Sequence, residues 1–345
     1  MVWATLKMKI LLLSPKSGIP KSKKEVNSFT SVWCYYLYHE LRTFDIEIDF
    51  LAVPPFDSDE ELSQWFENLD VEKYHGIVAL GLRYFSQLPQ AIGQSLYDRY
   101  QGILCQLYDG SRLDSDPVDV TFTFRDDDWR YPLGSSNNRY QRHHDNNVLI
   151  GWAADSRLIK SKQPRKKLSI LVDHSAFNHN ASDRSFDTLM NIRNLIHSGV
   201  YKDHGFDSVE VRRFVSGEVE IVDIDNFTIE RYDRKGISYV DACKEYSKSH
   251  IFCVTHEESV GQAIIENATS GALILSPKGL VNKDRLNTTR HIEWDSTINW
   301  QSTLDAIDIK KSRQKALENS WHDISKKIID TIETRYNQKH SEESL

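Results

Sequence analysis

Short apolar segments alternate with segments of helical periodicity along the chain, and this alternation restricts the possible folds more than any other feature of the sequence. Residues 8–13 form a continuous apolar run, residues 28–41 carry apolar and aromatic side chains at helical spacing, and residues 46–53 form a second apolar run. A strand, a helix and a strand in this order form a βαβ unit, whose two strands lie parallel in one sheet. The same alternation predicts further strands over 75–80, 102–108 and 148–152 and helices over 60–69 and 88–97. The first half of the chain is therefore predicted to form a doubly wound parallel sheet.

A second alternating series follows a polar, basic stretch at 160–167, whose proline and charges are typical of a linker. Residues 114–147 interrupt the first series and are expected to be irregular. Residues 311–345 are predicted to form one amphipathic helix with a disordered polar tail. The second series predicts strands over 168–172, 208–214, 219–222, 250–254 and 272–275 and helices over 186–198, 239–247 and 261–270. We therefore expect two α/β domains, at 1–158 and 159–335, and a polar tail at 336–345.

The length, charge and cysteine content narrow the class of protein. A chain of 345 residues is long enough for two hydrophobic cores, and its net charge of −7 gives no general attraction to nucleic acids. No apolar run reaches the roughly 18 residues needed to cross a bilayer, and the short run at 10–13 lacks the length and cleavage site of a signal peptide. The four cysteines are scattered without a C-x-x-C pair, which favours reduced thiols in the core. We expect a cytoplasmic protein.

The turn after the predicted strand at 250–254 is the expected place for a ligand, because open α/β sheets bind ligands beyond the carboxyl ends of their strands. Gly261 stands at the start of the next predicted helix, where exposed backbone amides and the helix dipole favour an anion such as a diphosphate. Glu258 lies in the turn and Glu266 about one turn inside the helix, so both carboxylates can accept hydrogen bonds from the hydroxyls of one sugar or ribose ligand. The spacing alone also fits a helix-start acid at Glu258 and a solvated helix residue at Glu266.

The segment 258–271, ESVGQAIIENATSG, resembles the E-x7-E motif of retaining GT-B glycosyltransferases, especially those of glycosyltransferase family four. Residues 239–253 are similar to the helix and strand that precede this motif in the family. The final helix with Trp321 looks like the one that crosses back to the first domain in such proteins. The resemblance implies a GT-B fold, in which two Rossmann-like, doubly wound domains face each other across a cleft.

The resemblance also implies roles for individual residues. Glu258 would contact the hydroxyls of the donor sugar, and Glu266 would bind the ribose of the nucleotide. The donor would also lie against a stretch of backbone formed by Ser259, Val260, Gly261 and Gln262. The chain departs from the family pattern where Val260 replaces the usual phenylalanine and Asn267 the usual alanine, and residues 173–184 lack the usual glycine-arginine and lysine-glycine pair. The cations that neutralise the diphosphate therefore cannot be carried over from the family.

Three further residues are candidates because of their own chemistry and position. Arg184, ahead of a predicted helix, is a candidate cation for the diphosphate, and a surface arginine fits the sequence equally. Asp109, at the end of a predicted strand, is a candidate base for the acceptor or a turn cap. His256 lies beside the key turn and can contact the sugar, a phosphate or a loop carbonyl. We expect no metal, because the adjacent His143 and His144 on an irregular segment seldom converge on one ion, and amide dipoles can stabilise the leaving phosphate.

These observations leave three hypotheses for the function. The first is a glycosyltransferase that moves a sugar from a UDP-, GDP- or similar donor to an acceptor, with retention of anomeric configuration and no further cofactor. The second is a sugar-nucleotide epimerase, because such enzymes also bind a nucleoside diphosphate between two domains of this kind. The third is a degenerate GT-B module that binds a sugar nucleotide or a partner without turnover. Saccharides, lipid-linked glycans, proteins and nucleic acids all stay open as acceptors.

Overall fold

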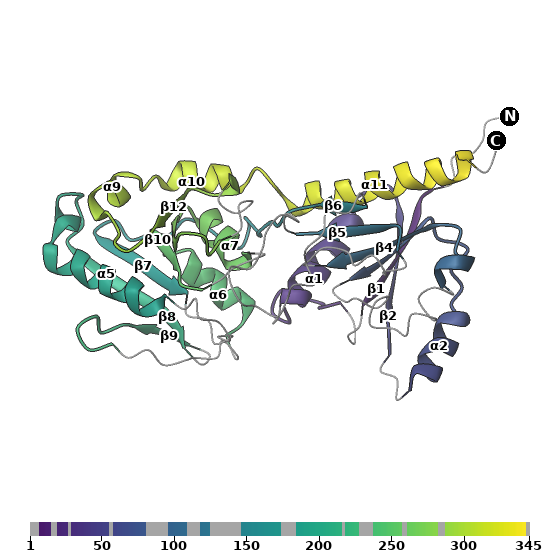
Figure 1. Cartoon of the computed structure of the whole chain (residues 1–345), viewed down its shortest axis with the longest axis horizontal. Coiled ribbons are helices and arrows are strands. Elements are labelled where there is room, and N and C mark those ends of the chain that lie inside the picture. Colours follow the sequence, from purple (N-terminus) through teal and green to yellow (C-terminus); the bar gives the residue numbers. More distant parts are fainter. Residues whose placement is uncertain are drawn as a thin grey trace. The chain divides into compact units, whose positions relative to one another are not determined.

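The chain forms two compact units, which are described separately (Figure 1). The first unit contains the described residues up to Gly151 together with 321–342, and the second contains the described residues of 152–320. The transition at Gly151 precedes the boundary expected at residue 158. The computed structural model describes residues 7–14, 19–26, 29–54, 58–80, 96–108, 118–124, 146–173, 184–215, 218–227, 237–256, 261–281 and 287–342.

The first unit is built on a six-stranded parallel sheet in the order β2-β1-β3-β4-β5-β6. Helices α1 (Phe29–Leu41) and α2 (Asp59–Glu67) follow the first two strands. Every residue of β3 is buried, as expected for a short apolar run in the middle of a parallel sheet. The strands are β1 (Lys9–Ser14), β2 (Glu47–Ala52), β3 (Gly76–Leu80), β4 (Ile103–Tyr108), β5 (Val120–Thr123) and β6 (Asn147–Leu149).

Strand β5 contradicts the prediction that residues 114–147 are wholly irregular. Its four residues are buried and pair with β4 on one side and β6 on the other. A strand this short gives almost no periodic signal, and its neighbours in the sheet, which stabilise it, are distant in the sequence. The predicted helix at 88–97 lies mostly outside the described residues.

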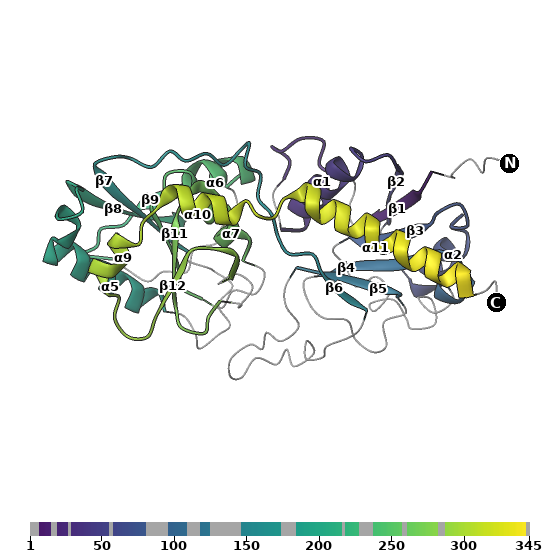
Figure 2. The same cartoon turned by 90° about the horizontal axis from the view of Figure 1, so that it is seen from above.

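The chain returns to the first unit through helix α11 (Trp321–Glu342), as the resemblance implied. Figure 2 shows α11 lying along the sheet of this unit. Its Trp321 ring stacks on Tyr36 of α1 with centroids 5.4 Å apart, and a Cβ atom on Gly76 of β3 would lie 2.8 Å from Ile332. The close approach of helix and sheet therefore requires a glycine in β3.

The prediction of one helix followed by a disordered polar tail over 311–345 was wrong in two respects. Two helices occupy this region, α10 (Ile309–Ala316) in the second unit and α11 in the first, so the chain must leave one unit between them. The expected polar tail from residue 336 continues α11 as far as Glu342. Lys339 anchors that end by donating to the carbonyl of Gly102 at 3.1 Å. No helix among the described residues is long and apolar enough to cross a membrane.

The second unit contains a six-stranded sheet in the order β12-β11-β10-β7-β8-β9. The sheet is parallel except for β9, which is antiparallel to β8 because only two residues connect them. This exception differs from the fully parallel sheet predicted. Strand β12 lies at the edge, beyond the last strand expected from the sequence. The strands are β7 (Lys167–Asp173), β8 (Ser208–Val215), β9 (Glu218–Ile221), β10 (Ile251–Val254), β11 (Leu273–Pro277) and β12 (His291–Trp294).

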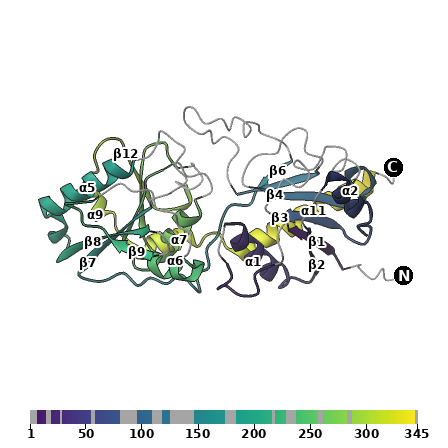
Figure 3. The same cartoon turned by 90° about the horizontal axis from the view of Figure 1, so that it is seen from below.

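Helices cover both faces of this second sheet (Figure 3). Helix α5 (Ser185–Ser198) packs on the face that carries Ile170 and Cys253, together with α9 (Trp300–Asp305). Helices α6 (Tyr239–Tyr246) and α7 (Gln262–Ser270) lie on the other face. Helix α10 packs against α7.

The basic stretch at 160–167 is not a free linker. The N–H of Lys162 donates to the carbonyl of Ser247 at 2.8 Å, and the hydroxyl of Ser161 donates to the carbonyl of Ser270 at 2.6 Å. These carbonyls lie at the ends of α6 and α7. The last carbonyls of a helix have no N–H donor within the helix, so the stretch supplies donors that the helices lack. The stretch is therefore attached to the second unit and leads directly into β7.

Candidate functional site

The winding of the second sheet reverses between β7 and β10. Strands β8 and β9 lie on one side of β7, and β10, β11 and β12 lie on the other. Asp173, the last residue of β7, is in register with Val254, the last residue of β10. Ligands of open α/β sheets bind at such a reversal, beyond the carboxyl ends of the strands. The turn that the sequence analysis selected follows β10 and therefore begins at this point.

Two helices begin beyond these strand ends without a side-chain cap. Arg184, the N-cap of α5, makes no capping hydrogen bond with its side chain. Gly261, the N-cap of α7, has no side chain and adopts a left-handed conformation with φ of 67°, which glycine reaches without strain. The first turn of a helix presents N–H groups that have no acceptor within the helix. By contrast, side chains cap α2, α6, α9 and α10, from Ser58, Ser238, Asn299 and Asp308.

An anion fits the chemistry at these two helix starts. The amides and the positive ends of the two helix dipoles both favour negative charge. Neither Arg184 nor Gly261 caps its helix with its own side chain, and a phosphate oxygen can accept from helix-start amides in the way that a capping oxygen does. The arrangement therefore suits a phosphate or diphosphate group.

Glu266 lies one turn inside α7 and is only 1% exposed. The hypothesis that it is a solvated helix residue is therefore wrong. Its Oε1 atom accepts a hydrogen bond of 2.9 Å from the side-chain amide of Gln262. A carboxylate offers about four acceptor positions, so this bond occupies only one of them.

Arg184 lies next to the end of β10. Its backbone N–H donates to the carbonyl of Thr255 at 2.8 Å, which brings the start of α5 beside the turn that contains His256. Its guanidinium is about half exposed and forms an ion pair of 2.9 Å with Asp187 in the same helix. The cation is thus available to a ligand at the start of α5, where Asp187 also contacts it.

Of the other predicted site residues, His256 is described and the rest lie outside the described residues. His256 is half-buried and directly follows Thr255. Asp109, as well as Glu258, Ser259 and Val260, lies outside the described residues. The same holds for His143 and His144. Among the residues that the structure does describe, no group of three or more metal-ligating side chains comes together.

Thr255, the residue after β10, has a bonding role that its sequence context does not predict. Its hydroxyl donates to the carbonyl of Asp173 and accepts a bond of 3.2 Å from the hydroxyl of Ser185. Thr255 therefore connects the ends of β7 and β10 with the start of α5. The only sequence signal for this role is a threonine directly after a buried strand, which is too common to select it.

The second half of the motif segment serves packing. Asn267, which departs from the family pattern, is buried, and its amide donates to the carbonyl of Ala263 at 2.8 Å within α7. Gly271 ends the helix with φ of 105°, and a Cβ atom there would lie 2.4 Å from Cγ2 of Ile309. This glycine allows α10 to approach α7.

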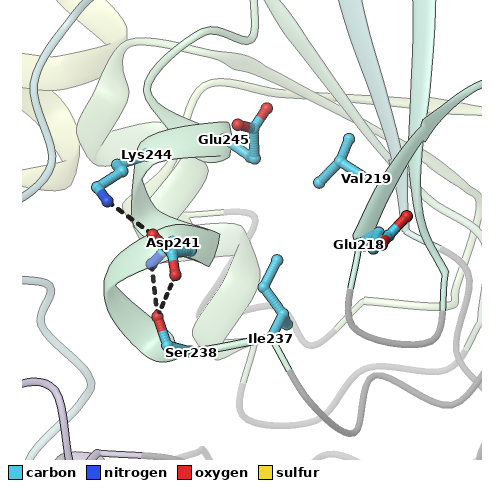
Figure 4. Close-up of a pocket in the computed structure, with 7 residues that line it drawn as sticks. All are labelled: Glu218, Val219, Ile237, Ser238, Asp241, Lys244 and Glu245. Carbon is cyan, nitrogen blue, oxygen red and sulfur yellow. Dashed lines mark hydrogen bonds and ion pairs between the residues drawn. The ribbon is translucent and has the colours of Figure 1, made fainter.

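A separate pocket of about 410 Å³ lies between the start of β9 and the start of α6 (Figure 4). Three of its seven described lining residues are acidic, and none of the seven is a predicted donor-binding residue. Lys244, the one cation among the described lining residues, is paired with Asp241 at 2.6 Å. The acidic side chains of the lining disfavour the binding of a phosphate. The lining residues are Glu218, Val219, Ile237, Ser238, Asp241, Lys244 and Glu245.

Comparison with solved structures identifies the fold. AviGT4, a glycosyltransferase involved in avilamycin A biosynthesis, superposes with a TM-score of 0.55 at 11% identity, over 96% of this chain and 98% of that one. Sucrose-phosphate synthase from Thermosynechococcus elongatus gives 0.56 at 11% identity, over 96% and 100%. Anabaena HepE in complex with UDP and glucose gives 0.51 at 9% identity, over 95% and 100%. No protein-family model and no curated protein matches the sequence. The two units thus have the two-domain α/β fold of GT-B glycosyltransferases.

Proposed function

We propose that this chain is a glycosyltransferase that moves a sugar from a UDP- or GDP-linked donor to an acceptor, with retention of the anomeric configuration. The observation that carries the proposal is the pair of helix starts without side-chain caps, α5 and α7, at the reversal of a GT-B sheet. Glu266 lies one turn inside α7, within reach of the same ligand. The complex of HepE with UDP and glucose supports a ligand of this class.

The diphosphate of the donor would lie against the amino ends of α5 and α7. Each helix end contributes about 0.3 to 1 kcal/mol to the binding of an exposed anion, and up to about 2 kcal/mol when the geometry is partly buried. Arg184 supplies a cation at the start of α5. The amides of the two helix starts and Arg184 would replace the arginine and lysine that the family usually carries after the first strand of this domain. No metal would then be needed.

The nucleoside and the sugar would be held by side chains on either side of the diphosphate. Glu266 would accept hydrogen bonds from the ribose hydroxyls, and Glu258 from hydroxyls of the donor sugar. His256 and the backbone of residues 259–262 would line the donor between them. Hydroxyl groups that meet carboxylates form charge-assisted hydrogen bonds, which are stronger than neutral ones.

The transfer itself breaks the bond between the anomeric carbon and the β-phosphate oxygen, and the electron pair stays on that oxygen. The acceptor atom forms the new bond on the same face of the sugar and gives its proton to a base, for which Asp109 is the candidate. Amide dipoles at the two helix starts would stabilise the charge that develops on the leaving diphosphate. Because these dipoles are already oriented, little reorganisation is needed during the reaction.

A binding screen followed by a product assay tests this function. Purified protein is screened by thermal shift against UDP, GDP and a panel of their sugar conjugates, because a ligand that binds only the folded state raises the melting temperature. Donors that bind are then incubated with acceptor panels, and the anomeric proton of the product is examined by NMR. An equatorial product from an axial donor would refute retention, and donor isomerisation without acceptor would indicate an epimerase. Binding without any turnover would indicate a degenerate module, and no nucleotide binding would refute the proposal as a whole.

A further inference from the structure

Thr255 makes three hydrogen bonds that join three separate segments. Its hydroxyl donates to the carbonyl of Asp173 at the end of β7, and the hydroxyl of Ser185 donates to it. Its carbonyl accepts the N–H of Arg184. Thr255 therefore connects the first turn of α5 directly to the ends of β7 and β10.

These contacts are inside the protein. Thr255 is 1% exposed, Asp173 is 1% exposed and Ser185 is 2% exposed. Water therefore cannot replace a lost partner at no cost, and a buried polar group without a partner is unfavourable. The segments that Thr255 joins should shift when its hydroxyl is removed. We expect the shift at the start of α5, because that segment begins with an exposed residue, Arg184.

We propose that Thr255 is a positioning residue, which sets the start of α5 so that its amides and those of α7 meet the same diphosphate. This inference rests on the proposed function. Thr255 itself touches no substrate, because it is buried behind the start of α5. The effect of helix amides on an anion falls off within a single turn, so a small displacement of α5 should weaken the binding of phosphate groups specifically.

A purely structural role predicts a different result. If Thr255 only stabilised the fold, its loss would lower the melting temperature and change all ligand affinities of the folded protein equally or not at all. The decisive quantity is therefore the ratio of two dissociation constants, that of the nucleoside and that of its diphosphate. The ratio isolates the contribution of the phosphates.

The experiment uses the full chain with Thr255→Val, which keeps the branched shape and removes the hydroxyl, and Thr255→Ser, which keeps the hydroxyl. Thr303→Val is the matched control, because Thr303 is also 1% exposed but lies in α9, which packs against η2 (Val200–Lys202) beyond the carboxyl end of α5. Dissociation constants are measured by calorimetry and ligand-observed NMR for UDP or GDP, whichever the native chain binds more tightly, and for its nucleoside.

The expected result is that Thr255→Val lowers the ratio by about fivefold to thirtyfold, because displacing the start of α5 removes a partly buried interaction of helix amides with the phosphates. Thr255→Ser and Thr303→Val should stay within about threefold of the native chain on the same scale. A ratio in Thr255→Val equal to that of the native chain would overturn the inference while the proposed function stands. Absence of UDP and GDP binding to the native chain would overturn both.

A second variant covers the case in which Thr255→Val does not fold. Ser185→Ala removes one of the two partners of the Thr255 hydroxyl and leaves the bond to Asp173 in place. It should lower the ratio in the same direction by a smaller factor. An unchanged ratio in Ser185→Ala, with Thr255→Val unfolded, would count against the positioning role.

Discussion

Replacing Glu266 with alanine is expected to weaken the binding of ribonucleotides more than that of nucleotides without ribose hydroxyls. Glu266 is 1% exposed and lies one turn inside α7. Its Oε1 atom accepts a hydrogen bond of 2.9 Å from the side-chain amide of Gln262. A carboxylate offers about four acceptor positions, and the bond from Gln262 uses one of them.

The expected size follows from this environment. A hydrogen bond to a charged group contributes about 1.5 to 3 kcal/mol when it is lost from a buried site. At about 1.4 kcal/mol per tenfold, that range corresponds to a rise of about tenfold to about 150-fold in the dissociation constant. The 2′,3′-dideoxynucleotide has no hydroxyl for the carboxylate, so its dissociation constant should change by less than about threefold.

Calorimetry with UDP or GDP and with the corresponding dideoxynucleotide measures both effects in one series. Glu318→Ala, at an exposed residue of the same unit, is the control for a lost carboxylate. Thermal unfolding of each variant shows that the folded state is being compared. If Glu266→Ala weakens both nucleotides equally, or neither, the assignment of Glu266 to the ribose is refuted.

Glu258→Ala should keep its affinity for the bare nucleoside diphosphate and lose roughly thirty- to a thousandfold in turnover. Calorimetry and steady-state assays on one preparation measure the two quantities. A lower melting temperature with normal turnover would show that Glu258 has a structural role. Gly271→Ala should lower the free energy of unfolding by about 2 to 5 kcal/mol in urea titrations, because φ is 105° and the new Cβ would lie 2.4 Å from Ile309. Gly205→Ala, at φ of 82° with nothing within 4 Å, should cost only about 1 to 2 kcal/mol, and equal losses would contradict the packing argument. Burial lowers the pKa of His250 from 6.5 to about 4, so the unfolded chain binds more protons between these values. The free energy of unfolding should therefore fall as the pH is lowered through this window, with a contribution from His250 of at most about 1.4 kcal/mol per pH unit. His250→Asn should reduce the slope by that contribution.

Most of the secondary structure was accessible from the sequence because burial leaves a periodic pattern. Strand β3 is buried at every residue and reads as a continuous apolar run. Helix α5 begins and ends within one residue of its prediction at 186–198, because Gly199 ends it in a left-handed conformation that glycine favours. Segments with few residues or with one exposed face, such as β5 and β12, gave no such pattern and were missed.

The candidate site was accessible only in part. The motif predicted that Gly261 would start a helix and that Glu266 would lie one turn inside it, and both residues have these positions. The motif could not show that Glu266 is buried, because burial of a polar residue depends on which helices pack around it. Nor could it show that α5 lacks a side-chain cap, since the N-cap of a helix is defined by backbone geometry.

The sequence by itself determined the class of the fold, because alternating apolar and helical segments have one common solution, a parallel sheet covered by helices. It also determined which segment follows β10, because residues directly after a buried strand must lie at the carboxyl edge of the sheet, where the candidate site is placed. Only the tertiary structure decided the order of the strands, and with it the reversal between β7 and β10. Thr255 and Arg184 are separated along the chain and meet at that reversal. The periodicity of a sequence reports which residues are buried, but their neighbours are set by packing between distant segments.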